Sequence, residues 1–353
     1  MNQNHLSRIS IKGYKSIDDC DVQLKNLNIL IGSNGAGKSA FIEFFNMINC
    51  MFDGCLQEYV ASHGGPDAIL RFGSGVTKQM ELGLYFGKSR YHAALRPTED
   101  GRLVFSEERL TNDRYDNINI CGGHFETRIR EYDSNISDVN CQAFHFNEFS
   151  AGSPIRHPQP VRQYEKLSQD GSNFAPYLYA LKKSHFGDYI RIVKRLRIIA
   201  PFFDDFYLAP DENDPAVIRL RWLESGCDKP LGADLLSDGV LRFACLLAVF
   251  RYPKERRPDI LLIDEPDLSL HPKALELLYH IINLVSNYRQ VICSTQSTEL
   301  LNKFSADDII VLDKTGGKTL LYRIDEDELE EWLANKTITE MWANSIIGGL
   351  PSR

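Results

Sequence analysis

The chain has 353 residues, of which 43% are hydrophobic and 25% are charged, and its formal net charge at pH 7 is -8. This composition is typical of a folded globular protein and excludes an intrinsically disordered chain. The negative charge disfavours a protein that is coated with nucleic acid, although a local basic groove is compatible with it. The length suits one large α/β domain or two smaller domains.

Neither a membrane span nor a secretory leader is expected. No stretch reaches the apolar length that a transmembrane helix needs, and the first residues, MNQNHLSRISIKG, lack the apolar core of a signal peptide. We therefore expect a cytoplasmic protein without membrane contact. The eight cysteines form no C-x-x-C pair, and several, such as Cys245 and Cys293, lie in apolar runs. This pattern favours reduced, buried thiols over a disulfide framework or a zinc site.

The N-terminal half predicts strands around one long helix. Residues 8–17 and 21–32 have the apolar patterns of strands, and the second segment ends in a glycine-rich loop. The segment KSAFIEFFNMINCMF that follows has helical spacing. Short strand-like pieces separated by turn formers then predict an antiparallel sheet. They lie at 79–87, 90–96, 102–110, 124–132 and 141–147.

The C-terminal half alternates helices with buried strands. The proline-rich stretch 150–162 predicts a loop or linker, and 173–203 is mostly helical. A helix that begins near Leu235 follows a strand at 216–224. Further strands are expected at 258–266, 289–297, 308–314 and 318–324, with a helix at 273–287 and an acidic helical tail from 325.

Buried strands that alternate with helices indicate an α/β fold, with a mixed, mostly parallel sheet flanked by helices. An antiparallel β lobe and a helical insertion are added to it. We expect four parts along the chain: an N-terminal lobe, a helical insertion or lid, a C-terminal lobe and a helical tail. Their ranges are 1–149, 150–234, 235–324 and 325–353.

A phosphate-binding loop is the clearest motif. Residues 32–39, GSNGAGKS, fit the pattern G-x-x-x-x-G-K-[ST] in full, between a predicted strand and a predicted helix. The glycines let several backbone N–H groups converge on one anion, and the helix N-terminus adds partial positive charge. We expect Lys38 to contact the β- and γ-phosphates of ATP and Ser39 to bind Mg²⁺. The expected nucleotide-binding residues are Ser33, Asn34, Gly35, Ala36, Gly37, Lys38, Ser39 and Ala40.

Two acids end the buried strand ILLIDEP. Side chains of adjacent strand residues point to opposite faces, so Asp264 and Glu265 can serve different purposes. Asp264 suits the support of the magnesium ion at Ser39, and Glu265 suits polarising the water that attacks the γ-phosphate. The alternative is a strand that merely ends in solvated charges and a turn former.

The next buried strand ends in the polar run STQS. Gln296 can donate to a γ-phosphate oxygen or hold the attacking water, because its amide both donates and accepts. Alternatively, Ser297 caps the helix that follows, and both interpretations are compatible. His271 precedes Pro272 and is expected to be an N-cap or a contact across a subunit boundary, since no partner lies at metal-ligand spacing.

With these motifs in order, the chain resembles the non-transporter branch of the ATP-binding-cassette ATPases, a type of P-loop NTPase. That branch includes RecF, the heads of structural-maintenance-of-chromosomes (SMC) proteins, the OLD nucleases and the Septu and Gabija defence ATPases. The likeness is greatest to small bacterial ATPases of the AAA type. The segments that carry it are IKGYKS, IGSNGAGKSAFIEFF, AFHFNEFS, DGSNFAPYLYAL, LSDGVLRFACLL, LLIDEPDLSLHP, STQS and the end MWANSIIGGLPSR.

The resemblance implies a composite site in a homodimer or higher oligomer. The signature step LSDG of one copy would close over the γ-phosphate bound by another, through Ser237, Asp238 and Gly239. Glu265 matches the hydrolytic glutamate, and Gln296 stands where transporters carry a histidine. The signature also lacks the second glycine and the glutamine of transporters. Asn147 or Glu148 is the best match to the glutamine loop.

Two functions follow from this resemblance. The first is an ATPase in DNA repair or anti-phage defence, which works with a separate effector such as a nuclease or a toxin-like protein. The second is a nucleotide-gated regulator with little turnover. A nuclease within this chain is not expected, because the domain that OLD relatives carry would need well over about fifty residues beyond Arg353. The signature, Gln296 and the IKGYKS start disfavour a transporter motor.

DNA is an alternative partner. The most basic stretch is helical, and a solvated helical face is favoured there over a DNA groove. Its basic residues are Lys182, Lys183, Arg191, Lys194, Arg195 and Arg197.

Overall fold

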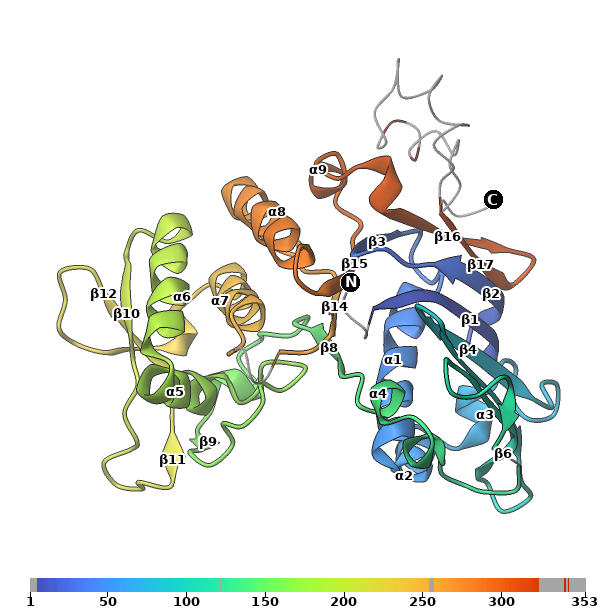
Figure 1. Cartoon of the computed structure of the whole chain (residues 1–353). Coiled ribbons are helices and arrows are strands. Elements are labelled where there is room, and N and C mark those ends of the chain that lie inside the picture. The colour runs from blue at the N-terminus through green and yellow to red at the C-terminus, as the bar shows by residue number, and fades with distance from the viewer. Residues whose placement is uncertain (1–4, 121, 254–256, 324–339, 341, 343–353) are drawn as a thin grey trace. The chain divides into compact units, whose positions relative to one another are not determined.

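The computed structural model describes residues 5–120, 122–253, 257–323, 340 and 342 (Figure 1). The chain divides into two compact units, each described by itself below. The first comprises 1–143, 258–264 and 286–353, and the second comprises 144–257 and 265–285. The helical tail expected from 325 lies outside the described residues, apart from positions 340 and 342. Of the helices in the described ranges, none has the length and apolarity needed to cross a bilayer.

The first unit is built on a 12-stranded sheet of order β7-β6-β5-β4-β1-β2-β17-β16-β3-β15-β14-β8, in which the last two residues of β8 belong to the second unit. The strands are β1 Leu6–Tyr14, β2 Ile17–Gln23, β3 Leu27–Ile31, β4 Met80–Phe86, β5 Ser89–Pro97, β6 Leu103–Thr111, β7 Ile118–Asn119, β8 Cys141–His145, β14 Ile260–Asp264, β15 Gln290–Ser294, β16 Ile309–Thr315 and β17 Lys318–Arg323. The helices are α1 Lys38–Asp53, α2 Leu56–Ser62, α3 Pro66–Ile69, α4 Ser134–Ser137 and α9 Thr298–Leu301. The mixed α/β fold expected from the sequence is confirmed.

Parallel strands form the part of this sheet that positions the site. β14 pairs with β15, β15 with β3 and β3 with β16, all in parallel. Every residue of β3, β14 and β15 is buried, which explains their continuous apolar sequences. α1 lies against the sheet (Figure 1). Its Phe41, Phe44 and Phe45 belong to one hydrophobic core with residues of β1, β2 and β4. Because these strands are parallel, their polar C-terminal ends meet at one edge.

The antiparallel part continues the same sheet. β4, β5 and β6 pair in antiparallel order, as the sequence predicted. The strand expected at 124–132 is wrong: this segment contains a 3-10 helix, Ile129–Glu131. Its backbone bonds to β6 at His124, whose carbonyl accepts from the Phe105 N–H at 2.9 Å, and side chains of the segment bond to other elements. Glu126, for example, accepts from the N–H groups of Leu56 and Gln57 at the start of α2.

Three other strand predictions change in position. β8 forms within 141–147, but it lies beside β14 and not with the antiparallel strands. Residues 8–17 contain the turn between β1 and β2, where Lys15 has a φ of 45°. Residues 21–32 break between β2 and β3, because the Asn28 side chain accepts from the Lys25 N–H and closes a turn there.

The second unit is mainly helical. Its helices are α5 Phe174–Ser184, α6 Phe186–Ile199, α7 Asp238–Phe250 and α8 Pro272–Ser286. Ser286, the last residue of α8, belongs to the first unit. A three-stranded sheet joins β10 Phe203–Tyr207, β12 Arg221–Glu224 and β13 Leu231–Gly232, and β9 Gln159–Pro160 pairs with β11 Val217–Ile218. The strand expected at 216–224 is thus divided, because β11 and β12 pair with different partners.

The core of the second unit surrounds α7. All ten residues from Leu241 to Phe250 are buried, so this helix is covered on every side. The buried set includes Arg242, whose guanidinium donates to the carbonyl groups of Phe146, Asn147 and Leu268. Burial lowers the pKa of Arg242. A charged group inside the core is tolerated here because backbone oxygens satisfy its N–H groups.

Candidate functional site

The phosphate-binding loop joins β3 to α1 within the first unit. Two of its glycines are required by close packing. A Cβ at Gly32 would lie 2.4 Å from the backbone oxygen of Leu312, and one at Gly37 would lie 2.9 Å from the side chains of Ser16 and Thr319. Gly37 also has a φ of 108°, which side-chain-bearing residues rarely adopt. The loop conformation therefore depends on glycine at these positions.

α1 begins in a way that favours an anion. Its N-cap is Gly37, no side chain caps the helix, and its first turn carries no acid. The first N–H groups of a helix have no intrahelical acceptor, and the helix dipole places partial positive charge beside them. Asn34 and Gly35 in the loop are exposed, as is Ser39 in the first turn. An uncapped, accessible helix start after a glycine loop is a site for phosphate.

Lys38 contributes a largely buried cation to this loop. Its side chain is 6% exposed, and its Nζ donates to the carbonyl oxygens of Gly32, at 2.7 Å, and Ser33, at 3.1 Å. These backbone oxygens hold the ammonium group against the loop itself. A multivalent phosphate is a stronger acceptor than a neutral carbonyl, so Lys38 is placed to exchange one for the other.

Three side chains from different elements meet beside this loop. The Ser39 hydroxyl donates to Oδ2 of Asp264 at 2.9 Å, and the Ser294 hydroxyl donates to Oδ1 of the same carboxylate. Asp264 is 8% exposed at the end of β14, and Ser294 ends β15. Parallel pairing of the strands brings both ends to the loop. The two residues predicted as magnesium ligands, Ser39 and Asp264, are therefore in direct contact.

The donor set of Ser39 and Asp264 fits Mg²⁺, which prefers hard oxygen ligands and uses few protein groups together with water and phosphate. Across the described ranges, no group of three or more His, Cys, Asp or Glu side chains could hold a metal alone. Ser294 was predicted only as part of a polar strand end. Its bond to Asp264 identifies it as a group that orients this carboxylate.

Glu265 and Gln296 both follow strands of the parallel core. Glu265 is the first residue of the segment 265–285 of the second unit, is half-buried and has a φ of 45°, in the left-handed region. Gln296 is also half-buried. Ser297 caps α9 by accepting from the Leu300 N–H at 3.2 Å, so the predicted cap is confirmed. The catalytic roles of Glu265 and Gln296 stay predictions.

The signature step LSDG starts α7 in the second unit. Ser237 is the N-cap, and its Oγ accepts from the N–H of Val240 at 3.4 Å. Asp238 forms an ion pair with Arg156 at 2.7 Å. A Cβ at Gly239 would lie 2.6 Å from the backbone oxygen of Ser269, so this glycine allows two backbones to approach. Ser237 therefore caps a core helix, and the contact with a second copy's ATP stays a prediction.

The remaining predicted residues fall in the second unit. Asn147 and Glu148 are exposed, and the Glu148 carboxylate accepts from Ser150. His271 accepts at Nδ1 from the Lys273 N–H at 3.3 Å, just before α8 begins at Pro272. This is the geometry of the predicted N-cap. The role of Asn147 or Glu148 as a glutamine-loop equivalent stays a prediction.

Three of the six basic side chains in this stretch form ion pairs with neighbouring carboxylates. Lys182 pairs with Asp205 at 3.0 Å, Arg191 with Asp188 at 3.0 Å and Arg197 with Asp204 at 2.8 Å. The Lys183 ammonium lies 4.0 Å from the ring centre of Tyr179. These contacts favour the solvated helical face over a DNA groove, because each pair removes a cation that would otherwise attract phosphates.

The seven cysteines in the described part of the chain are free thiols, and Cys20, Cys141, Cys245 and Cys293 are buried. Burial raises the pKa of Cys20 to about 12. It likewise raises the pKa of Cys245 far above its usual value. The thiols of Cys20 and Cys245 are therefore protonated and unreactive at neutral pH, as expected of core residues.

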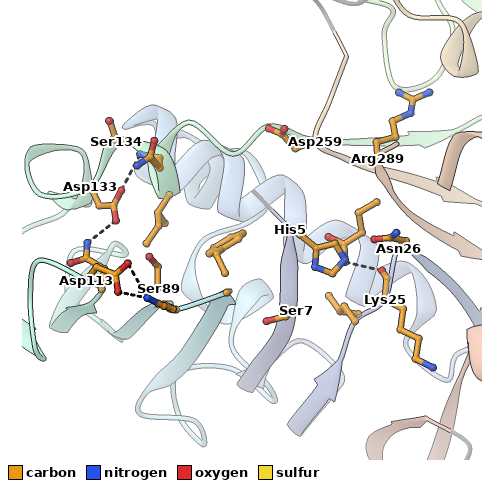
Figure 2. A pocket seen from close by; sticks show the side chains of 18 of the residues that line it. His5, Ser7, Lys25, Asn26, Ser89, Asp113, Asp133, Ser134, Asp259 and Arg289 are labelled. Carbon is orange, nitrogen blue, oxygen red and sulfur yellow. Dashed lines mark hydrogen bonds and ion pairs between the residues drawn. The ribbon is translucent and has the colours of Figure 1, made fainter. Parts of the chain in front are cut away.

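A cavity of about 1240 Å³ lies elsewhere in the first unit (Figure 2). Asn26, Asp259 and Gln290 line it just before or at the start of β3, β14 and β15, so it opens at the strand ends opposite the phosphate loop. Its lining contains both cations and carboxylates. Asp113 pairs with Lys88, and Asp259 accepts from the Asn140 N–H. The mixed and internally paired lining assigns no ligand class.

Comparisons with known proteins agree on one kind of domain. A family model described as "AAA ATPase domain" matches residues 5–186, and one described as "AAA domain, putative AbiEii toxin, Type IV TA system" matches residues 130–302. An OLD nuclease of Thermus scotoductus is 21% identical over 374 residues, which cover 92% of this chain. The chain spans 65% of that relative's length.

Solved structures show the same fold at low sequence identity. An SMC head bound to the C-terminal winged-helix domain of ScpA is 16% identical, with a TM-score of 0.57 over 94% of this chain and 99% of that one. An SMC head with an extended coiled coil, bound to the C-terminal domain of ScpA from Pyrococcus furiosus, has the same identity and TM-score over 94% of this chain and 98% of that one.

Proposed function

We propose a function from the following premise: the chain belongs to the family of AAA ATPase domains, in the clan that includes SMC heads and OLD proteins. The specific proposal is an Mg²⁺-dependent ATPase that dimerises around ATP. The observation that carries it is the contact between Ser39 and Asp264 beside the uncapped start of α1. A hydroxyl and a buried carboxylate at a phosphate-binding helix start form a site for a nucleotide with its metal ion.

Within this proposal the residues of the loop act by position and charge. Backbone N–H groups of residues 33–40 hold the phosphates, and Lys38 leaves the loop carbonyls to bind the β- and γ-phosphate oxygens. Ser39 and Asp264 would hold Mg²⁺, and the chemistry that the bound ion would supply is positive charge beside the phosphates. Glu265 orients and polarises the attacking water, and Gln296 contacts the γ-phosphate or that water.

The dimer is the second step of the proposal. In the proposed dimer, the start of α7 contacts the γ-phosphate bound by another copy through Ser237, Asp238 and Gly239. This is supported by a second helix start whose Ser237 and Asp238 are exposed, in a domain with the fold of SMC heads. The Glu265→Gln variant should bind ATP without hydrolysing it and elute as a dimer from size exclusion. A persistent monomer at saturating ATP would contradict this step.

The biological setting is proposed from the relatives. One relative is an OLD nuclease, and the description of one matching family model names a type IV toxin–antitoxin system. We infer that this ATPase serves DNA repair or anti-phage defence together with a nuclease or toxin-like effector. Copurification of tagged protein from its own host, with ATP and the Glu265→Gln variant, tests for such a partner. The cytoplasmic location stays a prediction.

The regulator with little turnover remains the second candidate. One observation favours it: α7 is already capped by Ser237, so its N-terminus has fewer N–H groups to offer a phosphate than an uncapped helix has. Steady-state phosphate release decides between the two. Turnover near background with tight ATP binding supports the regulator, and turnover that Glu265→Gln abolishes supports the ATPase.

A further inference from the structure

An arginine from a distant loop holds the signature step. Arg156 ends the short 3-10 helix Pro154–Arg156, and its side chain is 6% exposed. Its Nε donates to the Phe149 carbonyl at 2.7 Å. Its Nη1 donates to the carbonyl groups of Ala233 and Leu236. Its Nη2 donates to Leu236 and to Oδ1 of Asp238 at 2.7 Å. One side chain therefore contacts both sides of the step at which α7 begins.

Only a guanidinium supplies this set of contacts. Its three nitrogens are fixed in one plane and carry five N–H donors, whereas a lysine offers three donors from a single atom. Two of the acceptors, Leu236 and Asp238, flank Ser237. Arg156 therefore fixes the backbone on either side of the residue that is proposed to reach the γ-phosphate.

The ion pair also resolves an electrostatic conflict. The Asp238 side chain is 54% exposed and lies in the first turn of α7, where a negative charge stabilises the helix itself. In the proposed dimer, however, the same place receives a γ-phosphate, and two anions side by side repel. The Arg156 guanidinium cancels the charge of Asp238 before the phosphate arrives.

We propose that Arg156 is a positioning residue for ATP-driven dimerisation. It neutralises Asp238 and fixes the LSDG step so that Ser237 and the N-terminus of α7 can accept the second copy's γ-phosphate. This inference rests on the proposed dimer function. It adds a residue outside every motif of the sequence, 82 positions from its ionic partner.

Opposite effects of the two partners of the ion pair distinguish this role from a merely structural one. Arg156→Met leaves an uncompensated carboxylate and should raise the ATP concentration for half-maximal dimerisation roughly tenfold. Asp238→Asn leaves an uncompensated cation and should lower that concentration. In the double variant, Asp238→Asn should partly reverse the defect of Arg156→Met. A purely structural pair would instead make both single variants dimerise less readily.

The experiment uses the full chain in the Glu265→Gln background, with dimer measured by mass photometry across ATP concentrations. Binding of a fluorescent ATP analogue to the monomer and thermal unfolding are measured in parallel. The matched control is Arg197→Met with Asp204→Asn, an ion pair between α6 and β10 that should leave the dimerisation midpoint unchanged. If Arg156→Met unfolds, the exposed Asp238→Asn variant still tests the sign of the effect.

The outcomes separate cleanly. A lower midpoint for Asp238→Asn, and its partial rescue of any folded Arg156→Met, support the inference. An unchanged or raised midpoint for Asp238→Asn overturns it, as does an Arg156→Met protein that dimerises like its parent. A parent that stays monomeric at saturating ATP overturns the proposed dimer itself, and this inference with it.

Discussion

The N-termini of α1 and α7, on which the proposed function depends, differ in whether protein side chains already bond to them. α1 begins at Gly37 with no side-chain cap and no acid in its first turn. α7 begins with Ser237 as a cap and Asp238 in its first turn, and Arg156 binds that acid. An uncapped start leaves N–H groups for a ligand, whereas a capped one is stable alone. We infer that α1 carries nucleotide affinity and that α7 adds to it only in a dimer.

The largest expected effect comes from removing the cation in the first turn of α1. Lys38→Ala should weaken ATP binding on the order of 100-fold, because a hydrogen bond between charged groups in a sheltered site contributes about 1.5–3 kcal/mol. Titration calorimetry of the monomer measures this. Arg156→Met serves as the control at the other helix start and should leave monomer affinity within about twofold. An equal loss of ATP affinity in both variants would contradict the inference that α1, and not α7, supplies the affinity of the monomer.

The next effect concerns the packing of α7. Gly239→Ala forces a Cβ to within 2.6 Å of the Ser269 oxygen, a clash with backbone that should destabilise the fold by about 1–3 kcal/mol. Gly232→Ala is the matched control, because its Cβ would meet nothing closer than 3.6 Å, and it should change stability by less than about 0.5 kcal/mol. Thermal unfolding compares them. Equal melting temperatures would show that this glycine does not serve packing.

A comparison at Glu265 tests whether its backbone stores strain. Its φ of 45° is unfavourable for residues with a Cβ. Both Glu265→Ala and Glu265→Gly should abolish hydrolysis under the proposed role, but the glycine variant should be about 1 kcal/mol more stable than the alanine variant. Urea unfolding and phosphate release measure the two properties. An alanine variant as stable as the glycine variant would argue against strain.

The sequence predicted the loop and its partner carboxylate because their signals are local. The glycine loop lies between a strand and a helix, and Asp264 ends an apolar run, so each could be placed from its neighbours. Their contact through Ser39 then follows from parallel pairing. The hydrogen bond from Ser294 to Asp264 could not be predicted from the sequence, because a polar strand end does not reveal which hydroxyl faces which acid.

Contacts between distant segments explain what the sequence could not predict. No periodic pattern links Arg156 to Asp238, since their contact depends on how a proline-rich loop folds back onto α7. The strand expected at 124–132 is wrong for a similar reason. Glu108, fully buried in β6, accepts from the Thr127 hydroxyl and the Arg128 N–H, which holds that segment in a non-strand conformation.

The smallest expected effect sharpens the comparison of the two helix starts most directly. Ser237→Ala removes the cap of α7 and should lower the free energy of unfolding by about 1 kcal/mol. ATP binding by the monomer should not change, because α1 supplies that affinity. Ser297→Ala removes the equivalent cap from α9 and is the control for cap loss alone. In the Glu265→Gln background, Ser237→Ala should raise the ATP concentration needed for dimerisation, and Ser297→Ala should not. If both variants shift dimerisation equally, Ser237 is only a helix cap, and the phosphate contact assigned to α7 must come from its backbone.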